Sequence, residues 1–352
     1  MSDNIKLIDK LKNENTLSGD EWFSLLSGFT EEDRLYAAKA AREVTDSIYG
    51  KDIYIRGIVE FSNICKNDCY YCGLRAGNSN LERYRLTEEE IYECCKEGYE
   101  YGFRTFVLQS GEDLHFDTET ICRIISRIKN DYPECAITLS IGEKTYEEYK
   151  AYKEAGADRY LLRHETANKA HYERLHPENM SWDNRIRCLY DLKSLGYQTG
   201  CGIMIGSPYQ TTECIVDDML FMADFKPEMI GLGPFLPHSD TPFRDEPKGS
   251  YELTLLLISL CRLMLPHALI PATTALGTIK PLGREEGVQA GANVIMPNLS
   301  PVAVRKKYML YDNKICTGEE AAECVHCLTA RVKSTGYNIV VSRGDHSEFL
   351  PS

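Results

Sequence analysis

The chain has 352 residues, of which 43% are hydrophobic and 26% charged, an ordinary composition for a globular protein. Its formal net charge of -13 argues against a nucleic-acid-binding surface, which normally carries a basic patch. The start of the chain lacks the apolar stretch of a secretory signal, and the most apolar run, residues 253–265, is interrupted by Arg262 and too short to span a bilayer. We therefore expect a cytoplasmic protein that does not associate with membranes, in which this run forms a buried helix.

The expected elements follow a repeating order. Residues 1–50 predict helices, one of which begins at Thr30, and from about residue 50 short apolar runs alternate with amphipathic helical stretches. Two of these stretches begin with capping boxes, at Thr87 and Thr145. The strand candidates are residues 53–60, 105–109, 136–140, 159–164, 199–205, 229–235, 269–274 and 293–296.

Repeated βα units imply a parallel sheet, and eight of them predict a closed (β/α)8 barrel of the TIM type. We expect residues 51–300 to form this α/β barrel, residues 1–50 to form an N-terminal helical cap, and residues 301–352 to form a C-terminal extension. In barrels of this kind the chemistry lies at the carboxyl ends of the strands, so the residues that follow each strand are the candidates for function.

Three cysteines follow the first predicted strand: Cys65, Cys69 and Cys72, spaced C-x3-C-x2-C. A four-iron cluster normally takes four thiolate ligands, so three local cysteines with no fourth nearby leave one iron open to a ligand that is not protein. This arrangement is typical of radical S-adenosylmethionine (SAM) enzymes, as is an aromatic residue, Tyr71, before the third cysteine. A three-thiolate zinc site is the alternative, although zinc fingers more often use C-x2-C pairs with a second ligand pair downstream.

Polar residues also follow other strands. The second strand ends in Gln109-Ser110-Gly111-Glu112, where radical SAM enzymes carry a Gly-Gly-Glu-like turn, and Ser110 replaces the first glycine and places a hydroxyl in the expected cavity. The fourth ends in Arg163-His164-Glu165-Thr166, a run that is costly to bury unless it is paired or lines a ligand pocket. His164 alternates away from its neighbours, so we expect it to be structural.

The seventh strand ends in Thr273 and Thr274, whose hydroxyls suit anion binding, although β-propensity alone explains them equally well. Met229 and Met296 are assigned to packing by default, with a ligand contact as the alternative.

Near the C-terminus a second set, Cys316, Cys324 and Cys327, has the spacing C-x7-C-x2-C. It predicts an auxiliary iron–sulfur site, with zinc as the competitor. The chain has 14 cysteines and no secretory signal, which indicates metal ligation or a reducing, anaerobic cytosol. The eight others are expected to be small core residues: Cys94, Cys95, Cys122, Cys135, Cys188, Cys201, Cys214 and Cys261.

Taken together, these motifs resemble the HydE family of [FeFe]-hydrogenase maturases, within the biotin-synthase-like radical SAM proteins. The resemblance covers residues 30–350 and rests on the two cysteine sets, the Gln109 turn, the Arg163 run and the 271–275 segment. It implies a SAM-binding [4Fe-4S] cluster on Cys65, Cys69 and Cys72, and a second cluster, [4Fe-4S] or [2Fe-2S], on Cys316, Cys324 and Cys327. It also implies SAM contacts from Tyr71, Gly111, Glu112, Glu165 and Arg185, and a substrate pocket lined by Arg56, Gln109, Ser110, Arg163, Thr273, Thr274, Met296 and Tyr308.

The resemblance further implies reductive cleavage of SAM to a 5′-deoxyadenosyl radical. This radical would act on a sulfur-containing, cysteine-bound iron dicarbonyl cyanide supplied by a partner maturase, with an electron donor to reduce the cluster. Three alternatives stay open: a paralogue with another substrate, a methylornithine-synthase-like or biotin-synthase-like enzyme, and an iron–sulfur carrier that does not cleave SAM. A carrier needs no arranged SAM pocket, which is why the polar strand ends favour an enzyme.

Overall fold

The computed structural model describes residues 2–315 and 325–349. Its strands are β1 (Asp52–Ile55), β2 (Gly57–Ser62), β3 (Thr105–Ser110), β4 (Ala136–Ser140), β5 (Arg159–Leu161), β6 (Gln198–Cys201), β7 (Met204–Ile205), β8 (Met229–Ile230), β9 (Gly233–Pro234), β10 (Val294–Ile295) and β11 (Asn338–Val340). Its helices are α1 (Asp3–Glu14), α2 (Gly19–Gly28), α3 (Glu31–Tyr49), α4 (Glu88–Glu100), α5 (Thr118–Asp131), α6 (Tyr146–Ala155), α7 (Lys169–Leu175), α8 (Trp182–Ser194), α9 (Thr212–Phe225), α10 (Tyr251–Met264), α11 (Thr274–Ile279), α12 (Gly283–Gln289), α13 (Val302–Arg305), α14 (Val325–Ser334) and the 3-10 helix η1 (Ser347–Phe349).

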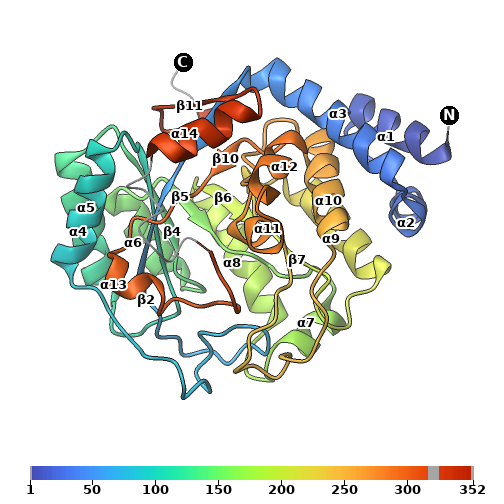
Figure 1. The fold of residues 1–352 in the computed structure, drawn as a ribbon. Helices are drawn as coiled ribbons and strands as arrows, with labels where there is room; N and C mark the ends of the chain where they lie inside the picture. Colours follow the sequence, from blue (N-terminus) through green and yellow to red (C-terminus); the bar gives the residue numbers. More distant parts are fainter. Residues whose placement is uncertain (1, 316–324, 350–352) are drawn as a thin grey trace.

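The central sheet closes on itself (Figure 1). Six parallel strands run in the order β2-β3-β4-β5-β6-β8. Parallel bridges then join Met229 to Leu269, Pro271 to Val294, and Asn298 back to Ile58 on β2. The predicted (β/α)8 barrel is therefore confirmed, with β1 and β2 as one strand interrupted at Arg56.

Two predicted strands are too long. The seventh makes only single bridges at Leu269 and Pro271, and α11 begins at Thr274. Pro271 has no N–H to donate, which limits ladder pairing there. The fourth, β5, ends at Leu161, and the chain then turns through Glu165, whose φ of 65° lies in the left-handed region. Both shortened strands lead directly into site residues.

The helix signals in the sequence are confirmed. Thr30, Thr87 and Thr145 each form a capping box with the acidic residue three positions later. Helix α10 contains the apolar run and is buried along nearly its whole length, between the barrel and the N-terminal helices. Among the described residues, no helix is both long and apolar enough to cross a membrane.

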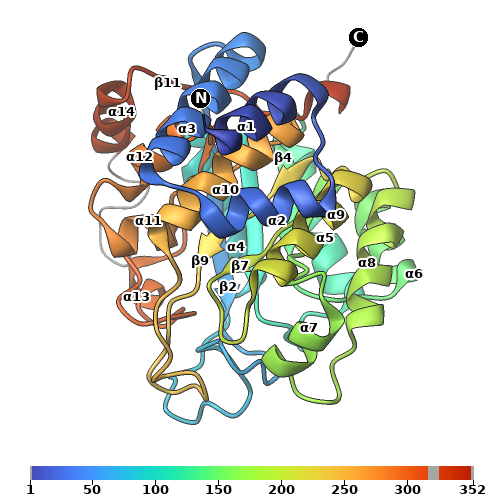
Figure 2. The same cartoon turned by 90° about the vertical axis from the view of Figure 1, so that its right-hand side faces the viewer.

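The two ends of the chain lie in different places on the barrel. Helices α1 to α3 pack against the outer helices α9 and α10, as Figure 2 shows. After α13 the C-terminal segment crosses the carboxyl ends of the strands, and β11 later pairs in parallel with β1. Residues 343–346, which follow β11, then enter the opposite, amino-terminal end of the barrel. The C-terminal segment therefore contacts both ends of the barrel.

Candidate active site at the carboxyl ends of the strands

Cys65, Cys69 and Cys72 lie in the loop 63–85 after β2, named here the cysteine loop. The thiol of Cys65 accepts a hydrogen bond from the backbone N–H of Glu112 at 3.3 Å. Burial raises the pKa of all three thiols. Burial and the nearby Cys65 raise the pKa of Cys72 to about 12. Burial and the nearby Cys72 raise the pKa of Cys69 well above its usual value. The effects of Cys65 and Cys72 on Cys69 place the three half-buried thiols near one another, where thiolates would need a cationic partner.

The cysteine loop is ordered by Arg83. Its guanidinium donates to four backbone carbonyls, those of Asn63, Leu74, Arg75 and Asn78.

Within residues 2–315 and 325–349, no three His, Cys, Asp or Glu side chains converge on a point that could hold one metal ion. Zinc ligands converge in that way, whereas the cysteines of a four-iron cluster bind different irons.

The turn after β3 packs directly on the cysteine loop. A Cβ at Gly111 would lie 2.3 Å from the carbonyl oxygen of Ile64, so only glycine fits this approach. The next residue, Glu112, is buried; its Oε1 accepts from the backbone N–H of Glu143 at 2.9 Å, and its Oε2 lies 3.1 Å from Lys66. The hydroxyl of Ser110 donates to the carbonyl oxygen of Gly111 at 2.6 Å.

Arg185 and Glu165 lie beside this turn. The guanidinium of Arg185, on α8, is 2.5 Å from Glu143 and donates to the carbonyl oxygen of Arg163 at 2.9 Å. Glu165 Oε2 lies 3.1 Å from Arg163 Nη2, yet it is buried and accepts no hydrogen bond. Glu165 and Arg185, which we predicted to contact SAM, therefore each contact Arg163, which we predicted to line the substrate pocket.

One wall of the barrel interior carries a polar chain. Gln109 Nε2 donates to the hydroxyl of the buried Tyr308 at 3.3 Å. The ammonium of Lys314 donates to the Tyr308 carbonyl oxygen at 3.0 Å and forms a buried ion pair with Glu60, which also accepts from Asn298 at 2.8 Å. The prediction placed Gln109 and Tyr308 together correctly, but it missed Glu60 and Lys314.

Arg56 occupies the interior below this wall. It is 4% exposed, and its polar contacts are Met229 Sδ at 3.0 Å and the Gly344 carbonyl oxygen at 3.3 Å. No carboxylate of the described residues lies within ion-pair distance, and its Nε has no partner. Burial, the largest cause, and then the nearby Arg159 lower the pKa of Arg56 well below its usual value.

The remaining substrate candidates lie just after the seventh and eighth strand positions of the barrel. Met296 packs with Met229 in one small apolar cluster, so the packing interpretation is confirmed for both. Thr273 caps α11 without a side-chain capping bond, and its buried Oγ1 has no partner. Thr274 is the first residue of that helix and is half-buried. Buried polar atoms that make no hydrogen bond thus occur in Arg56, Arg163, Glu165 and Thr273, although Glu165 Oε2 is ion-paired with Arg163.

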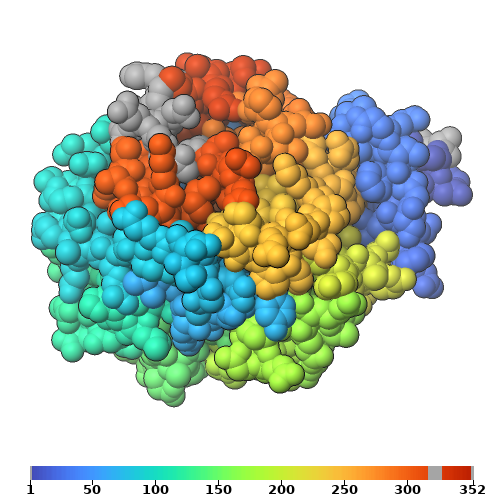
Figure 3. Space-filling view, turned by 60° about the horizontal axis from the view of Figure 1, so that its bottom comes forward, coloured from blue at the N-terminus to red at the C-terminus, as the bar shows by residue number. Residues whose placement is uncertain are grey.

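Three segments meet over the mouth of the barrel (Figure 3). Gly73 of the cysteine loop donates through its N–H to Leu310 at 2.9 Å, and Asp312 donates through its N–H to Pro237 at 3.1 Å. Asn80 then donates to Asp240 at 2.7 Å and closes the ring of contacts. The cysteine loop, residues 236–249 and residues 307–315 therefore cover the site together.

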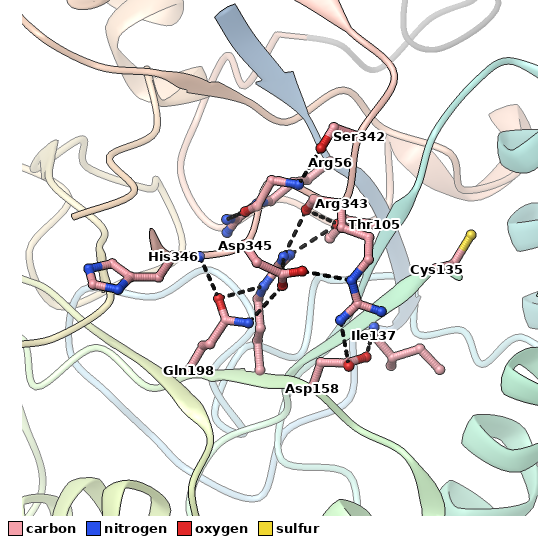
Figure 4. A network of polar contacts seen from close by, with 12 residues as sticks. Arg56, Thr105, Cys135, Ile137, Asp158, Gln198, Ser342, Arg343, Asp345 and His346 are labelled. Carbon is pink, nitrogen blue, oxygen red and sulfur yellow. Dashed lines mark hydrogen bonds and ion pairs between the residues drawn. The ribbon is translucent and has the colours of Figure 1, made fainter. Parts of the chain in front are cut away.

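A polar network fills the other end of the barrel (Figure 4). The fully buried Arg159 lies 2.5 Å from Asp345 and donates to the Arg343 carbonyl oxygen at 2.7 Å. Asp345 also accepts from Gln198 at 2.7 Å, and Thr105 donates to the Arg343 carbonyl oxygen at 2.8 Å. The turn 343–346, named here the floor turn, thus binds the inner faces of β3, β5 and β6.

The second cysteine set is only partly described. Cys316 and Cys324 lie outside the described residues. Cys327 lies in the first turn of α14 and is exposed. The geometry of the predicted auxiliary site is therefore not part of the described structure.

Comparison with known proteins identifies the family. The Radical SAM superfamily model matches residues 59–222. The [FeFe] hydrogenase maturase subunit HydE of Thermotoga maritima is 48% identical over 298 residues, which cover 85% of each chain. The chain belongs to the HydE family of radical SAM enzymes. Members of the radical SAM superfamily use a [4Fe-4S] cluster and SAM, so the sequence-based interpretation of the cysteine loop as part of a radical SAM enzyme is confirmed.

Other relatives share the barrel. The 3-methylornithine synthase of Methanosarcina barkeri is 30% identical over 335 residues, covering 93% of this chain and 92% of that protein. A crystal structure of methylornithine synthase matches with a TM-score of 0.81 at 28% identity, over 95% of this chain and 97% of that one. A crystal structure of the [FeFe]-hydrogenase maturase HydG also has a TM-score of 0.81, at 23% identity over 96% of this chain and 76% of that one, which shows a common fold.

Several residues of the site region escaped sequence reasoning. Glu143, the partner of Arg185, follows β4, so the rule applied to the other strand ends would have found it. His164 is fully buried and lies 3.3 Å from Asp218 on α9, which confirms its structural role. Burial and the nearby Arg185 lower the pKa of His176 to about 3. Neither Asp218 nor His176 stands at a strand end, so no local signal marked them.

Proposed function

We propose that this HydE-family enzyme is a hydrogenase maturase that cleaves SAM reductively and acts on an anionic, sulfur-containing, cysteine-bound iron dicarbonyl cyanide. The observation that carries the proposal is the set of buried polar atoms that make no hydrogen bond in Arg56, Arg163, Glu165 and Thr273. A buried polar group without a hydrogen bond costs about 1–3 kcal/mol, so a polar ligand that bonded to these four side chains would offset that cost. An iron–sulfur carrier has no need of this arrangement.

Cys65, Cys69 and Cys72 would hold the [4Fe-4S] cluster. The donor set fits, because the three thiols lie near one another and the Glu112 N–H donates to Cys65 Sγ at 3.3 Å, the kind of bond that tunes cluster sulfurs. When bound and reduced, the cluster supplies the electron that cleaves SAM to methionine and a 5′-deoxyadenosyl radical. The polypeptide contributes by orienting the reactants and excluding water.

Tyr71, Gly111, Glu112, Glu165 and Arg185 would contact SAM. The charges suit that ligand: Glu165 offers a buried carboxylate oxygen without a hydrogen bond to a ribose hydroxyl or the amino group, and Arg185 offers a guanidinium to its carboxylate. Glu143 and Glu112 hold this set in place, because Glu143 pairs with Arg185 while its N–H donates to Glu112.

The substrate pocket would be lined by Arg56, Arg163, Thr273, Thr274, Met296, Gln109, Ser110 and Tyr308. Arg56 supports an anionic occupant, because a buried guanidinium that forms no ion pair is strongly destabilising unless an anion binds it. The loops over the mouth and the floor turn would keep water from this space. That protection is required where a reactive radical must meet one chosen atom.

The proposal has three further parts, two about partner proteins and one about the second cysteine set. A second maturase would supply the iron complex, and a low-potential electron donor would reduce the cluster. Cys316, Cys324 and Cys327 would bind a non-essential auxiliary cluster.

The test is complementation. The gene is expressed in an anaerobic host that makes an [FeFe]-hydrogenase and the other maturases but lacks its own HydE, and hydrogen evolution is measured. Restored activity with the wild-type chain, and none with Cys69→Ala, supports the proposal. If SAM is cleaved in vitro but hydrogenase activity does not return, the substrate is different. An amino acid substrate would then be the next candidate, given the 30% identity to 3-methylornithine synthase.

A further inference from the structure

The cysteine loop is attached at one point to the end of helix α7. The backbone N–H of Tyr70 donates to the carbonyl oxygen of Leu175 at 3.0 Å. The hydroxyl of Tyr71 lies 3.1 Å from Nε2 of His176, the residue that follows the helix. Cys69 Sγ is 3.7 Å from Met180 Sδ in the same stretch. These contacts join the cysteine loop to the segment that begins at Glu165.

The direction of the Tyr71 hydrogen bond follows from the second nitrogen of His176. Nδ1 lies 2.9 Å from the carbonyl oxygen of Tyr172, which can only accept. Nδ1 therefore carries the proton, and in the neutral ring Nε2 is an acceptor. In this contact the Tyr71 hydroxyl therefore donates to His176. The α7 backbone holds the imidazole, and the imidazole in turn orients the tyrosine.

The imidazole of His176 is held rigidly. It is 2% exposed, stacks on the ring of Tyr172 at 3.9 Å between centroids, and meets the ring of Tyr71 edge-on at 5.4 Å. Neither aromatic neighbour can rotate without losing packing. A side chain buried and hydrogen-bonded on both nitrogens in this way can fix the position of its partner to within a narrow range.

We infer that His176 is a positioning residue for the cysteine loop, acting through the Tyr71 hydroxyl and linking that loop to the 165–176 segment that carries Glu165. This inference rests on the proposed roles of the three loop cysteines and of Glu165. It predicts that the cysteine loop loses its preorganised shape when the His176 acceptor is removed, even in protein that contains no cluster.

The test uses hydrogen–deuterium exchange of residues 66–84 in the cluster-free full chain. His176→Phe keeps a stacking ring but removes the acceptor, and loop exchange should accelerate about tenfold, as expected for the loss of one buried hydrogen bond. His176→Gln can offer an amide oxygen near the Nε2 position and should restore slow exchange. His171→Phe is the matched control, because His171 lies on helix α7, which ends just before His176, and contacts Pro208 and Ser207 rather than the loop.

A double-mutant cycle decides whether Tyr71 transmits the effect. Tyr71→Phe should accelerate exchange by itself, and adding His176→Phe should cause no further increase. In cluster-loaded enzyme, His176→Phe should raise KM for SAM about tenfold with a smaller change in kcat. Unchanged loop exchange in His176→Phe, or multiplicative effects in the double variant, would overturn the inference. Because exchange is measured without cluster or SAM, the result tests the inference even if the proposed function is wrong.

Discussion

The carboxylate of Asp345 lies 2.5 Å from the guanidinium of Arg159, a residue of β5 with no exposed surface. This pair fastens the C-terminal floor turn inside the barrel, 186 residues away along the chain. Through the carbonyl oxygen of Gly344, the same turn contacts Arg56 at 3.3 Å. The floor turn is therefore part of the framework beneath the proposed substrate pocket.

The floor turn predicts a pH dependence of stability. Burial alone raises the pKa of Asp345, but Arg159, Arg343 and Gln198 favour its charged form and lower the pKa from 3.8 to about 2. Because the folded pKa is depressed, the pair contributes stability above the unfolded pKa, and this is lost as the pH falls from about 4 to about 2. This contribution is about 2 kcal/mol. Urea denaturation of wild type and Asp345→Asn should show their difference shrinking over that range; a pH-independent difference would contradict the assignment.

Gly142 should be required for SAM binding through Glu112. It has a φ of 80°, and a Cβ there would lie 2.1 Å from Cγ of Glu112. Gly196 has a φ of 74° with no atom within 4 Å, so Gly196→Ala reproduces the backbone strain without the clash. We expect Gly142→Ala to raise KM for SAM about tenfold, the effect of displacing one charged hydrogen-bonding group. Equal KM values for the two variants would show that Glu112 does not contact SAM.

Substitution by methionine should lower the free energy of unfolding at Arg159 but not at Arg56. Arg159→Met leaves Asp345 buried and without one of its arginine partners, and should lower the free energy of unfolding by about 3–5 kcal/mol. Arg56→Met removes a buried charge that forms no ion pair and should not lower it, while raising KM for the anionic substrate and preserving SAM cleavage. Thermal and urea denaturation of the two variants provide the comparison. A large loss of stability in Arg56→Met would mean that Arg56 has a structural role.

The two cysteine sets should differ in importance. Cys69→Ala should abolish SAM cleavage, measured as 5′-deoxyadenosine under reducing anaerobic conditions, because a proposed cluster ligand is lost. Cys135→Ala, a buried core thiol away from the loop, is the control and should retain cleavage. Cys324→Ala should also retain most of it. If Cys324→Ala were as damaging as Cys69→Ala, the auxiliary role of the second set would be wrong.

The parts of the site that sequence predicted share one physical basis. Parallel strands carry their carboxyl ends to one end of a barrel, so Cys65, Gly111 and Glu112 were expected to meet, and they do. Residue type alone did not reveal what the hydroxyl of Ser110 does, because its local bond to a backbone carbonyl depends on a rotamer rather than on a pattern.

The parts that sequence missed depend on long-range pairs. Asp345 pairs with Arg159, which precedes it by 186 residues, and Lys314 reaches Glu60 from the C-terminal segment. No periodicity or spacing links such residues, because their contact exists only once the barrel has closed. His176 escaped for a related reason: a lone histidine at a helix end is a common structural feature, and its role depends on its contacts with Tyr71 and Tyr172.

The most direct test of the central claim is 5′-deoxyadenosine production by anaerobically reconstituted, dithionite-reduced protein, with and without the cysteine-bound iron dicarbonyl cyanide complex. We predict that the complex strongly stimulates formation of 5′-deoxyadenosine and is itself consumed, and that Arg56→Met weakens this stimulation while the unstimulated rate persists. Slow cleavage that the complex does not change would contradict the proposed substrate. No cleavage at all by cluster-replete protein would contradict the assignment of this chain as a working radical SAM enzyme.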